Sequence, residues 1–441
     1  MSEICVIGVG HVGLVTAVCL AKLGHSVIGV DKNAERIDQL NRGQCPFYEP
    51  GLDELLDEGL RQGRLAFSTR LSDGIVGSEI IFICVGTPAV ADGRADMSQV
   101  EEVARAVAQH MTGYKLIVEK STVPVKTSQW IKRTIGLLNR RGVAFDVASN
   151  PEFLREGSAI HDFMHPDRIV IGVESERAKA LMLRLYEGFD CPILVTDIST
   201  AEIIKHASNS FLAMKISYIN MIADLCERAG ADVRMVAEGM GYDARIGRAF
   251  LDAGVGYGGS CFPKDVKAFA ALAEELGVNF GLLREVDRIN EARIERLMAK
   301  LREALWVLNG KQIGVLGLAF KPDTDDIREA PSARLIDRLL RETDMRLKLY
   351  DVKAMSAMRE LYPPDERLAY VDSPYEAARD AEAIVILTEW DEFKKLDLMK
   401  LKGVMRTPII VDGRNIFEPD HMQELGFEYY CMGRKNIRNH F

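Results

Sequence analysis

The hexapeptide GVGHVG at residues 8–13 constrains the fold of this chain more than any other feature. It follows the strand-like run EICVI and opens a helix-like stretch that ends near residue 25. A second strand-like run, HSVIGVD, then ends at Asp31. Glycines at these spacings, between a strand and a helix, form the turn on which Rossmann-like domains bind a dinucleotide. The alternative is a glycine turn without a ligand.

The spacing assigns a separate role to each residue of this turn. Gly8 makes the tight turn, Gly10 lets a pyrophosphate approach the backbone, and Gly13 lets the helix pack closely on the strand. The phosphates would lie on the helix N-terminus, where backbone N–H groups point outward. Asp31 would accept hydrogen bonds from ribose hydroxyls and repel a 2′-phosphate, which favours NAD over NADP. The positive charge of Arg36 weakens this preference for NAD.

Strands and helices alternate along most of the first half of the chain. Further strands are expected at 80–86, 115–122, 145–151 and 168–173. Such alternation predicts an α/β fold with a doubly wound, mostly parallel sheet that helices cover on both faces. From residue 310 the pattern returns, with strands expected at 312–320, 346–351, 383–389 and 408–413.

Between the two alternating regions, residues 199–230 contain no proline and no glycine before Gly230. Ser199 and Glu202 fit a capping box at the start of a helix, and Gly230 fits its end. A helix of this length spans ~45 Å. Because it is apolar on more than one face, we expect it to join two Rossmann-like domains and to form a dimer interface. The expected domains are 1–198, the helical region 199–300 and 301–441.

Composition excludes several classes of protein. The chain has 441 residues, 47% hydrophobic and 27% charged, which is typical of a soluble globular protein. No apolar run is long enough to span a membrane, and the N-terminus lacks the basic region of a signal peptide. The net charge of −9 argues against general nucleic-acid binding. Eight scattered cysteines without a CxxC pair suit the reducing cytoplasm and predict no metal site.

One cysteine has unusual neighbours. Cys261 follows the glycine-rich run GVGYGGS and precedes Pro263, which suits the first position of a helix that ends at Gly277. A helix N-terminus and Lys264 in its first turn both favour a thiolate. The arrangement is typical of a nucleophile presented to a substrate, and the alternative is a buried structural cysteine.

Two other sets of polar residues are candidates for a site. Lys205 and Asn209 lie four residues apart on an otherwise apolar helix, so they share a face. The functional interpretation is a small site that binds an oxyanion or relays a proton. The alternative is a polar stripe exposed to solvent. Glu152 and Glu156 follow an expected strand, at the edge where parallel sheets bind ligands. The alternative for these two carboxylates is an ordinary charged helix start.

Taken in order, the motifs resemble those of the nucleotide-sugar 6-dehydrogenases over essentially the whole chain. GVGHVG, CVGTP (84–88) and STVP (121–124) resemble the NAD-binding segments of that family. NPEFLREG (150–157), the set Glu202, Lys205 and Asn209, and GYGGSCFPKD (256–265) resemble its active-site segments. ARIGRAF (244–250), FKPDTDDIRE (320–329) and VDGRN (411–415) resemble its substrate-side segments.

The resemblance implies two successive oxidations at C6 of a sugar, with two NAD, and a role for each catalytic residue. Cys261 would attack the intermediate aldehyde and later form a thioester. Glu152 would be the base for its hydrolysis, and Asp265 would help to remove the alcohol proton through a water. Lys205 and Asn209 would stabilise the oxyanion. Thr122 would hold the catalytic water.

The resemblance also implies the contacts of both ligands. Those with the cofactor fall at Gly8, Gly10, Val12, Gly13, Asp31, Arg36, Thr87, Thr122, Glu156, Lys264 and Arg328. Those with the substrate fall at Glu152, Phe153, Leu154, Lys205, Asn209, Arg245, Phe250, Tyr257, Gly258, Phe320, Lys321 and Arg414. Arg245 would reach the neighbouring subunit of a homodimer or higher homo-oligomer, and the second α/β region would bind the UDP.

Within the family, the cysteine loop and the Arg-Ile-Gly triplet resemble one branch more than the others. Members of that branch convert UDP-glucose to UDP-glucuronate for polysaccharide synthesis. The alternatives are oxidation of GDP-mannose or of a UDP-N-acetylhexosamine. Outside the family activity, the alternative is a non-catalytic sensor of NAD and nucleotide sugars. Cys261, Lys205 and Asp265 argue against a sensor, which needs none of them.

Overall fold

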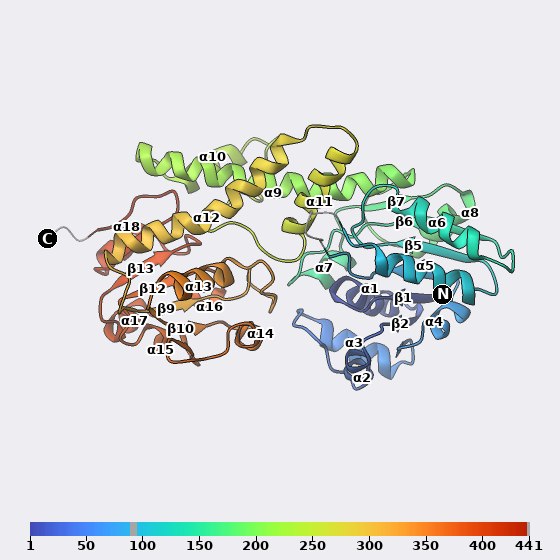
Figure 1. Ribbon diagram of the computed structural model, residues 1–441, viewed down its shortest axis with the longest axis horizontal. Coiled ribbons are helices and arrows are strands. Elements are labelled where there is room, and N and C mark those ends of the chain that lie inside the picture. The colour runs from blue at the N-terminus through green and yellow to red at the C-terminus, as the bar shows by residue number, and fades with distance from the viewer. Residues whose placement is uncertain (89–94, 439–441) are drawn as a thin grey trace. The chain divides into compact units, whose positions relative to one another are not determined.

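A computed structural model describes residues 1–88 and 95–438 of the protein (Figure 1). The chain divides into two compact units, each with its own sheet. The first consists of Met1–Ser208 and Ala268–Val278, and the second of Asn209–Lys267 and Asn279–Phe441. Each unit is therefore built from two separate stretches of sequence.

The sheet of the first unit has the strand order β3-β2-β1-β4-β5-β6-β7-β8. Its strands are β1 (Glu3–Ile7), β2 (Ser26–Val30), β3 (Leu65–Ser68), β4 (Ile80–Ile83), β5 (Lys115–Glu119), β6 (Phe145–Ser149), β7 (Ile169–Gly172) and β8 (Ile193–Thr196). Neighbouring strands are parallel except β6 and β7, which pair antiparallel through Ser149 and Gly172. The expected mostly parallel sheet is confirmed.

Helices cover both faces of this sheet and create two separate hydrophobic cores. They are α1 (His11–Lys22), α2 (Ala34–Asn41), α3 (Leu52–Arg61), α4 (Leu71–Gly77), α5 (Ser98–His110), α6 (Thr127–Leu138), α7 (Ala159–Met164) and α8 (Glu176–Leu185). In β1, Ile4 and Val6 face the core under α1, α3, α7 and α8, whereas Cys5 and Ile7 face the core under α4, α5 and α6. This alternation is the expected signature of a doubly wound sheet.

The long helix α9 (Ile198–Ala229) contributes to both units and is unbroken in Figure 1. Its end at Gly230, with φ of +72°, agrees with the expectation. The expected capping box is wrong, because Asp197 caps the helix by accepting from the Thr200 amide at 2.9 Å. Glu202 instead accepts from the amides of Lys126 and Ser128 at 2.6 and 3.1 Å. It thus caps α6, whose own N-cap residue supplies no side-chain bond.

The second unit repeats the doubly wound pattern, with all strand pairs parallel in the order β11-β10-β9-β12-β13-β14. The strands are β9 (Gln312–Leu316), β10 (Arg346–Tyr350), β11 (Leu368–Tyr370), β12 (Ala383–Ile386), β13 (Ile409–Asp412) and β14 (Glu428–Cys431). The helices are α10 (Val233–Gly241), α11 (Phe262–Glu275, shared with the first unit), α12 (Gly281–Leu305), α13 (Pro331–Glu342), α14 (Met355–Leu361), α15 (Pro374–Ala378), α16 (Asp391–Lys394), α17 (Leu398–Val404) and α18 (Pro419–Glu424).

In both sheets the strand order reverses beside the first strand, between β1 and β4 and between β9 and β12. Ligands of open α/β sheets bind at such switch points, outside the carboxyl ends of the strands. Two Rossmann-like folds connected through a long helix are therefore confirmed. Among the described residues, no helix has both the length and the hydrophobicity needed to cross a bilayer.

Candidate active site

The turn between β1 and α1 has the shape that a dinucleotide requires. Gly8 has φ of +90°, and a Cβ there would lie 2.7 Å from the carbonyl oxygen of Cys84. A Cβ on Gly13 would lie 1.8 Å from the carbonyl oxygen of Gly8. At Gly10, by contrast, a Cβ would meet nothing within 4 Å. The turn is thus closed by its outer glycines and leaves open space at the N-terminus of α1, where phosphates bind.

Asp31 lies directly after β2 and is tied to this turn. Its Oδ2 accepts from the Val9 amide at 3.0 Å and pairs with Arg36 Nη1 at 3.1 Å. Because Arg36 is paired with the carboxylate, its charge is not directed at a 2′-phosphate. The carboxylate at the strand end and the open helix N-terminus together fit a dinucleotide that carries a free ribose 2′-hydroxyl.

The two cofactor loops that follow β4 and β5 are in contact with each other. The Thr87 hydroxyl donates to the Thr122 carbonyl oxygen at 2.9 Å. Both threonines therefore lie at the carboxyl end of the sheet, close to the switch point, as their predicted roles require.

The segment after β6 places Glu152 against α9. Lys205 Nζ lies 2.9 Å from Glu152 Oε1, and the two side chains are 4% and 5% exposed. Glu152 Oε2 also accepts from the Leu154 amide at 2.6 Å, and the Phe153 ring lies 5.5 Å from Lys205 Nζ. Residues 150–157 are irregular up to α7, so the alternative of a charged helix start is wrong. The alternative of a solvated stripe is wrong at Lys205, which is buried.

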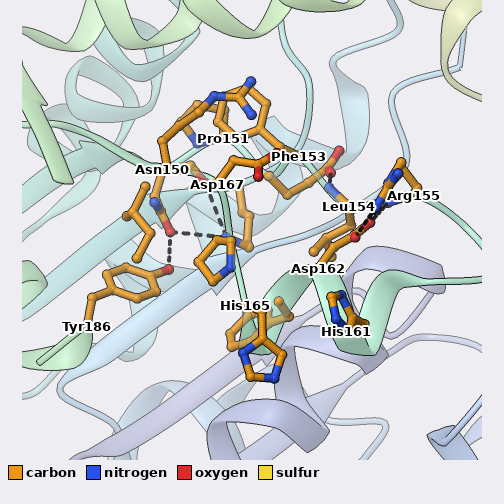
Figure 2. Close-up of a pocket in the computed structure, with 16 residues that line it drawn as sticks. Asn150, Pro151, Phe153, Leu154, Arg155, His161, Asp162, His165, Asp167 and Tyr186 are labelled. Carbon is orange, nitrogen blue, oxygen red and sulfur yellow. Dashed lines mark hydrogen bonds and ion pairs between the residues drawn. The ribbon is translucent and has the colours of Figure 1, made fainter. Parts of the chain in front are cut away.

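A further set of polar residues, which the sequence analysis did not single out, lines a cavity together with Glu152. Figure 2 shows Tyr186 directed at Asn150, whose Oδ1 also accepts from Lys120 Nζ at 3.1 Å. They line a cavity of about 150 Å³ that extends along residues 150–155. Burial lowers the pKa of Lys120 to about 8, although the charges of Cys84 and Glu152 act against this shift. The sequence signal that could have identified this set is Lys120, a lysine directly after the fully buried strand β5.

Cys261 lies immediately before α11, and its carbonyl accepts from the Asp265 amide at 2.8 Å. The predicted helix is confirmed, with its start one residue earlier than expected. Burial raises the pKa of Cys19 and Cys84 to about 12, which makes them inert structural thiols. Cys261, at a helix terminus and only partly buried, has a different environment.

Asp265 connects the other candidates of the second unit. Its carboxylate accepts from Asn209 Nδ2 at 2.6 Å and lies 2.9 Å from Lys264 Nζ. Asp265 is 1% exposed and Asn209 is 6% exposed, so the solvated-stripe alternative is also wrong at Asn209. The Lys264 ammonium group, which the sequence suggested as a partner of the thiol, pairs with Asp265.

The glycines before Cys261 allow protein segments, rather than only a ligand, to approach the loop. A Cβ on Gly258 would lie 2.4 Å from the Glu329 carbonyl oxygen, and one on Gly256 would lie 2.4 Å from Asn290 Oδ1. The Gly259 amide donates to the Arg328 carbonyl at 2.8 Å. The loop is therefore held against the segment 320–329 at the carboxyl end of β9.

Arg414, two residues after the end of β13, holds the same region together. Its guanidinium donates to the carbonyl oxygens of Leu387 at 2.8 Å, of Gly256 at 3.1 Å and of Phe320 at 3.1 Å. Its Nε also lies 3.2 Å from Glu389 Oε2. Arg414 thus joins the cysteine loop to the strand ends, and its donors are engaged by the protein.

The remaining predicted residues of the second unit differ in burial and in partners. Tyr257 is buried, its ring lies 5.8 Å from that of Phe262, and burial raises its pKa. Phe250 has φ of +65°. Lys321 lies beside Phe320, and Arg328 pairs with Asp326. Arg245 pairs with Asp243, and its side chain is 89% exposed.

The two Rossmann-like folds, the dinucleotide turn and a thiol at a helix N-terminus define a nucleotide-dependent dehydrogenase. Three consecutive domain models of the UDP-glucose/GDP-mannose dehydrogenase family match the chain: the NAD binding domain at residues 2–190, the central domain at 199–292 and the UDP binding domain at 314–419. The chain belongs to this family, and its cofactor is NAD.

Curated and solved relatives cover nearly all of the chain. The UDP-glucose 6-dehydrogenase YwqF of Bacillus subtilis is 45% identical over 99% of this chain and 98% of its own length. A UDP-glucose dehydrogenase structure from Pyrobaculum islandicum has a TM-score of 0.92 and 40% identity, covering 99% of this chain and 98% of its own. A UDP-D-ManNAc dehydrogenase structure from Pyrococcus horikoshii has a TM-score of 0.85 and 32% identity, covering 98% and 99%.

The environment of Asp31 leads to a prediction on cofactor choice. The protein should prefer NAD over NADP in kcat/KM by at least about tenfold, equivalent to about 1.4 kcal/mol. Asp31→Asn should reduce this preference, because it removes the repulsive charge and releases Arg36 from its ion pair. Steady-state rates with both cofactors test this expectation. Equal kcat/KM values in the unsubstituted protein would show that Arg36 dominates.

Proposed function

We propose that this protein oxidises UDP-glucose twice at C6 and produces UDP-glucuronate. The observation that carries the proposal is Cys261, held at the N-terminus of α11 in the turn whose Asp265 contacts Asn209 and Lys264. An oxidation that ends at the aldehyde needs no such nucleophile, whereas oxidation to the acid gains from one. The UDP-glucose dehydrogenases among its relatives support the choice of sugar nucleotide.

The proposed reaction gives separate tasks to the residues of the site. NAD, when bound, accepts the hydride from C6 in each oxidation. Asp265 takes the alcohol proton through a water in the first stage. The Cys261 thiolate then adds to the aldehyde carbon and forms a thiohemiacetal, whose oxidised form is a thioester. Lys205 and Asn209, one turn apart on α9, donate to the oxygen that carries the negative charge.

The last step is hydrolysis of the thioester. Thr122 holds a water, Glu152 removes its proton, and the Cys261 thiolate leaves as the carboxylate forms. The Lys205 ammonium group binds Glu152 at 2.9 Å, and this ion pair orients the carboxylate. A covalently held intermediate explains how one site performs both oxidations without release of the aldehyde.

We extend the proposal to the remaining ligand contacts. Thr87, Glu156, Lys264 and Arg328 would contact NAD, together with the residues of the glycine turn. Phe153, Leu154, Phe250, Tyr257, Gly258, Phe320, Lys321 and Arg414 would surround the UDP-sugar. Arg414 would do so while joined to Gly256, so that it also shapes the loop. In this proposal residues 1–198 bind NAD, residues 199–300 carry the cysteine loop, and residues 301–441 bind UDP.

We also propose a cytoplasmic homodimer. On α9, Phe211, Tyr218 and Leu225 follow one another at seven-residue intervals and are 58%, 51% and 60% exposed. An apolar stripe of this kind is typical of a subunit interface. Arg245, also exposed, would then serve the neighbouring subunit. A protein that sediments only as a monomer would contradict the proposal.

The decisive experiment is the stoichiometry of NADH formation with a panel of nucleotide sugars. Each UDP-glucose consumed should yield two NADH, because the thioester couples the oxidations. The panel includes GDP-mannose and a UDP-N-acetylhexosamine, the second because the Pyrococcus horikoshii relative is named for such a substrate. A ratio of one with aldehyde as the end product would contradict the mechanism, and faster turnover of another sugar would transfer the proposal to it.

A further inference from the structure

The carboxylate of Glu49 joins two segments that are far apart in the sequence of the first unit. Glu49 is 2% exposed and lies between α2 and α3. Its Oε2 lies 2.8 Å from His11 Nε2 and accepts from the Gly157 amide at 2.7 Å. Its Oε1 accepts from the Ala159 amide at 2.8 Å. Because a carboxylate only accepts, the Nε2 atom of His11 is the donor.

The two segments joined in this way carry different parts of the chemistry. His11 is the first residue of α1, next to Gly10 and the open space at the helix N-terminus. Its ring also stacks on Phe47 with centroids 4.5 Å apart. Gly157 and Ala159 close the irregular segment that begins at Asn150 and carries Glu152 and Glu156.

We propose that Glu49 is a positioning residue that couples NAD binding at the glycine turn to the conformation of the segment 150–158. The turn must be ordered to receive the pyrophosphate, and His11 cannot keep its bond to Glu49 unless that carboxylate stays in place. The same oxygen holds Gly157. Order at one end therefore favours order at the other, which is a coupling free energy between the two segments. The inference rests on the proposed function only for the task of Glu152.

A matched pair of substitutions at His11 separates coupling from packing. His11→Gln keeps an N–H donor at nearly the position of Nε2, whereas His11→Met has similar length and no donor. Glu49→Gln is the second probe. Its amide presents one N–H₂ group to a backbone N–H, so one of the bonds to Gly157 or Ala159 is lost in either orientation.

The measurement is hydrogen exchange of the peptide containing Gly157 and Ala159 in the full-length protein, with and without saturating NAD. Calorimetry gives the NAD dissociation constant of each variant. In the unsubstituted protein and in His11→Gln, NAD should slow exchange of this peptide. In His11→Met the slowing should disappear, and NAD should bind about fivefold more weakly. Glu49→Gln should raise exchange of the peptide without NAD.

Two results would overturn the proposal. If His11→Met retained the full NAD-dependent slowing, protection would come from direct contact of the cofactor with Glu156 and not through Glu49. If His11→Gln behaved as His11→Met, packing of the ring and not the hydrogen bond would be responsible. No substrate is needed for these measurements, so their failure is distinguishable from failure of the two-NADH assay.

Discussion

Cys261→Ser should bind UDP-glucose and NAD and yet turn over more slowly by roughly a thousandfold or more. A serine hydroxyl does not ionise near neutral pH, and the N-terminus of α11 contributes only about 0.3–1 kcal/mol toward an anion. The first oxidation does not involve the thiol, so it can still proceed. The second stage should stall, because an alkoxide leaves from an ester far less readily than a thiolate leaves from a thioester.

Mass spectrometry after incubation with both substrates should find added mass on the peptide that contains residue 261. The adduct is an ester or a trapped species at the aldehyde level. Cys191→Ser is a suitable control, since this thiol lies in the first unit next to β8 and outside every proposed contact. Near-normal steady-state turnover of Cys261→Ser would contradict the role of the cysteine as nucleophile.

Lys205→Met should lower the free energy of unfolding by about 3–5 kcal/mol, because it leaves the Glu152 carboxylate buried without its counter-charge. It should also reduce kcat by roughly 10²–10³-fold through loss of a donor to the oxyanion. Chemical denaturation and steady-state kinetics measure the two effects independently.

The double substitution Lys205→Met with Glu152→Gln separates stability from chemistry. Neutralising both partners removes the isolated charge, so most of the lost stability should return. Turnover should stay low, since the oxyanion donor and the base are both absent. If Lys205→Met unfolded at the same denaturant concentration as the unsubstituted protein, the Lys205–Glu152 ion pair would be exposed to solvent. This result would contradict the burial of the two side chains.

Much of the fold could be predicted because its signals are local. The buried strands β1, β4 and β5 are short apolar runs bounded by turns, and each was expected close to its observed position. The strands β3, β8, β11 and β14 were missed. They form the edges of the two sheets. In β3, β8 and β11 several residues are partly or fully exposed, so no continuous apolar run marks the strand. Strand β14 is largely buried, but its run EYYC was not recognised as a strand.

The candidate site was predictable where the motif itself sets the geometry. Gly8 and Gly13 show in the structure the close contacts that their spacing implied. Long-range partners were not predictable, because nothing in a linear sequence relates Glu49 to Gly157 or Arg414 to Gly256. The capping box failed for the same reason. Glu202 has the correct spacing for a local cap, but a helix 74 residues upstream offers it a buried alternative.

That bond between Glu202 and the start of α6 has a consequence for biosynthesis. The amides of Lys126 and Ser128 have no Glu202 carboxylate to bind until the ribosome has added a further 74–76 residues. At the usual rate of about 5–20 residues per second, the ribosome needs roughly 4–15 s to deliver it. During this interval α6 is a nascent helix without its N-terminal cap, next to strands that have already been made. The rate of protein synthesis thus sets the earliest moment at which α6 can receive its cap.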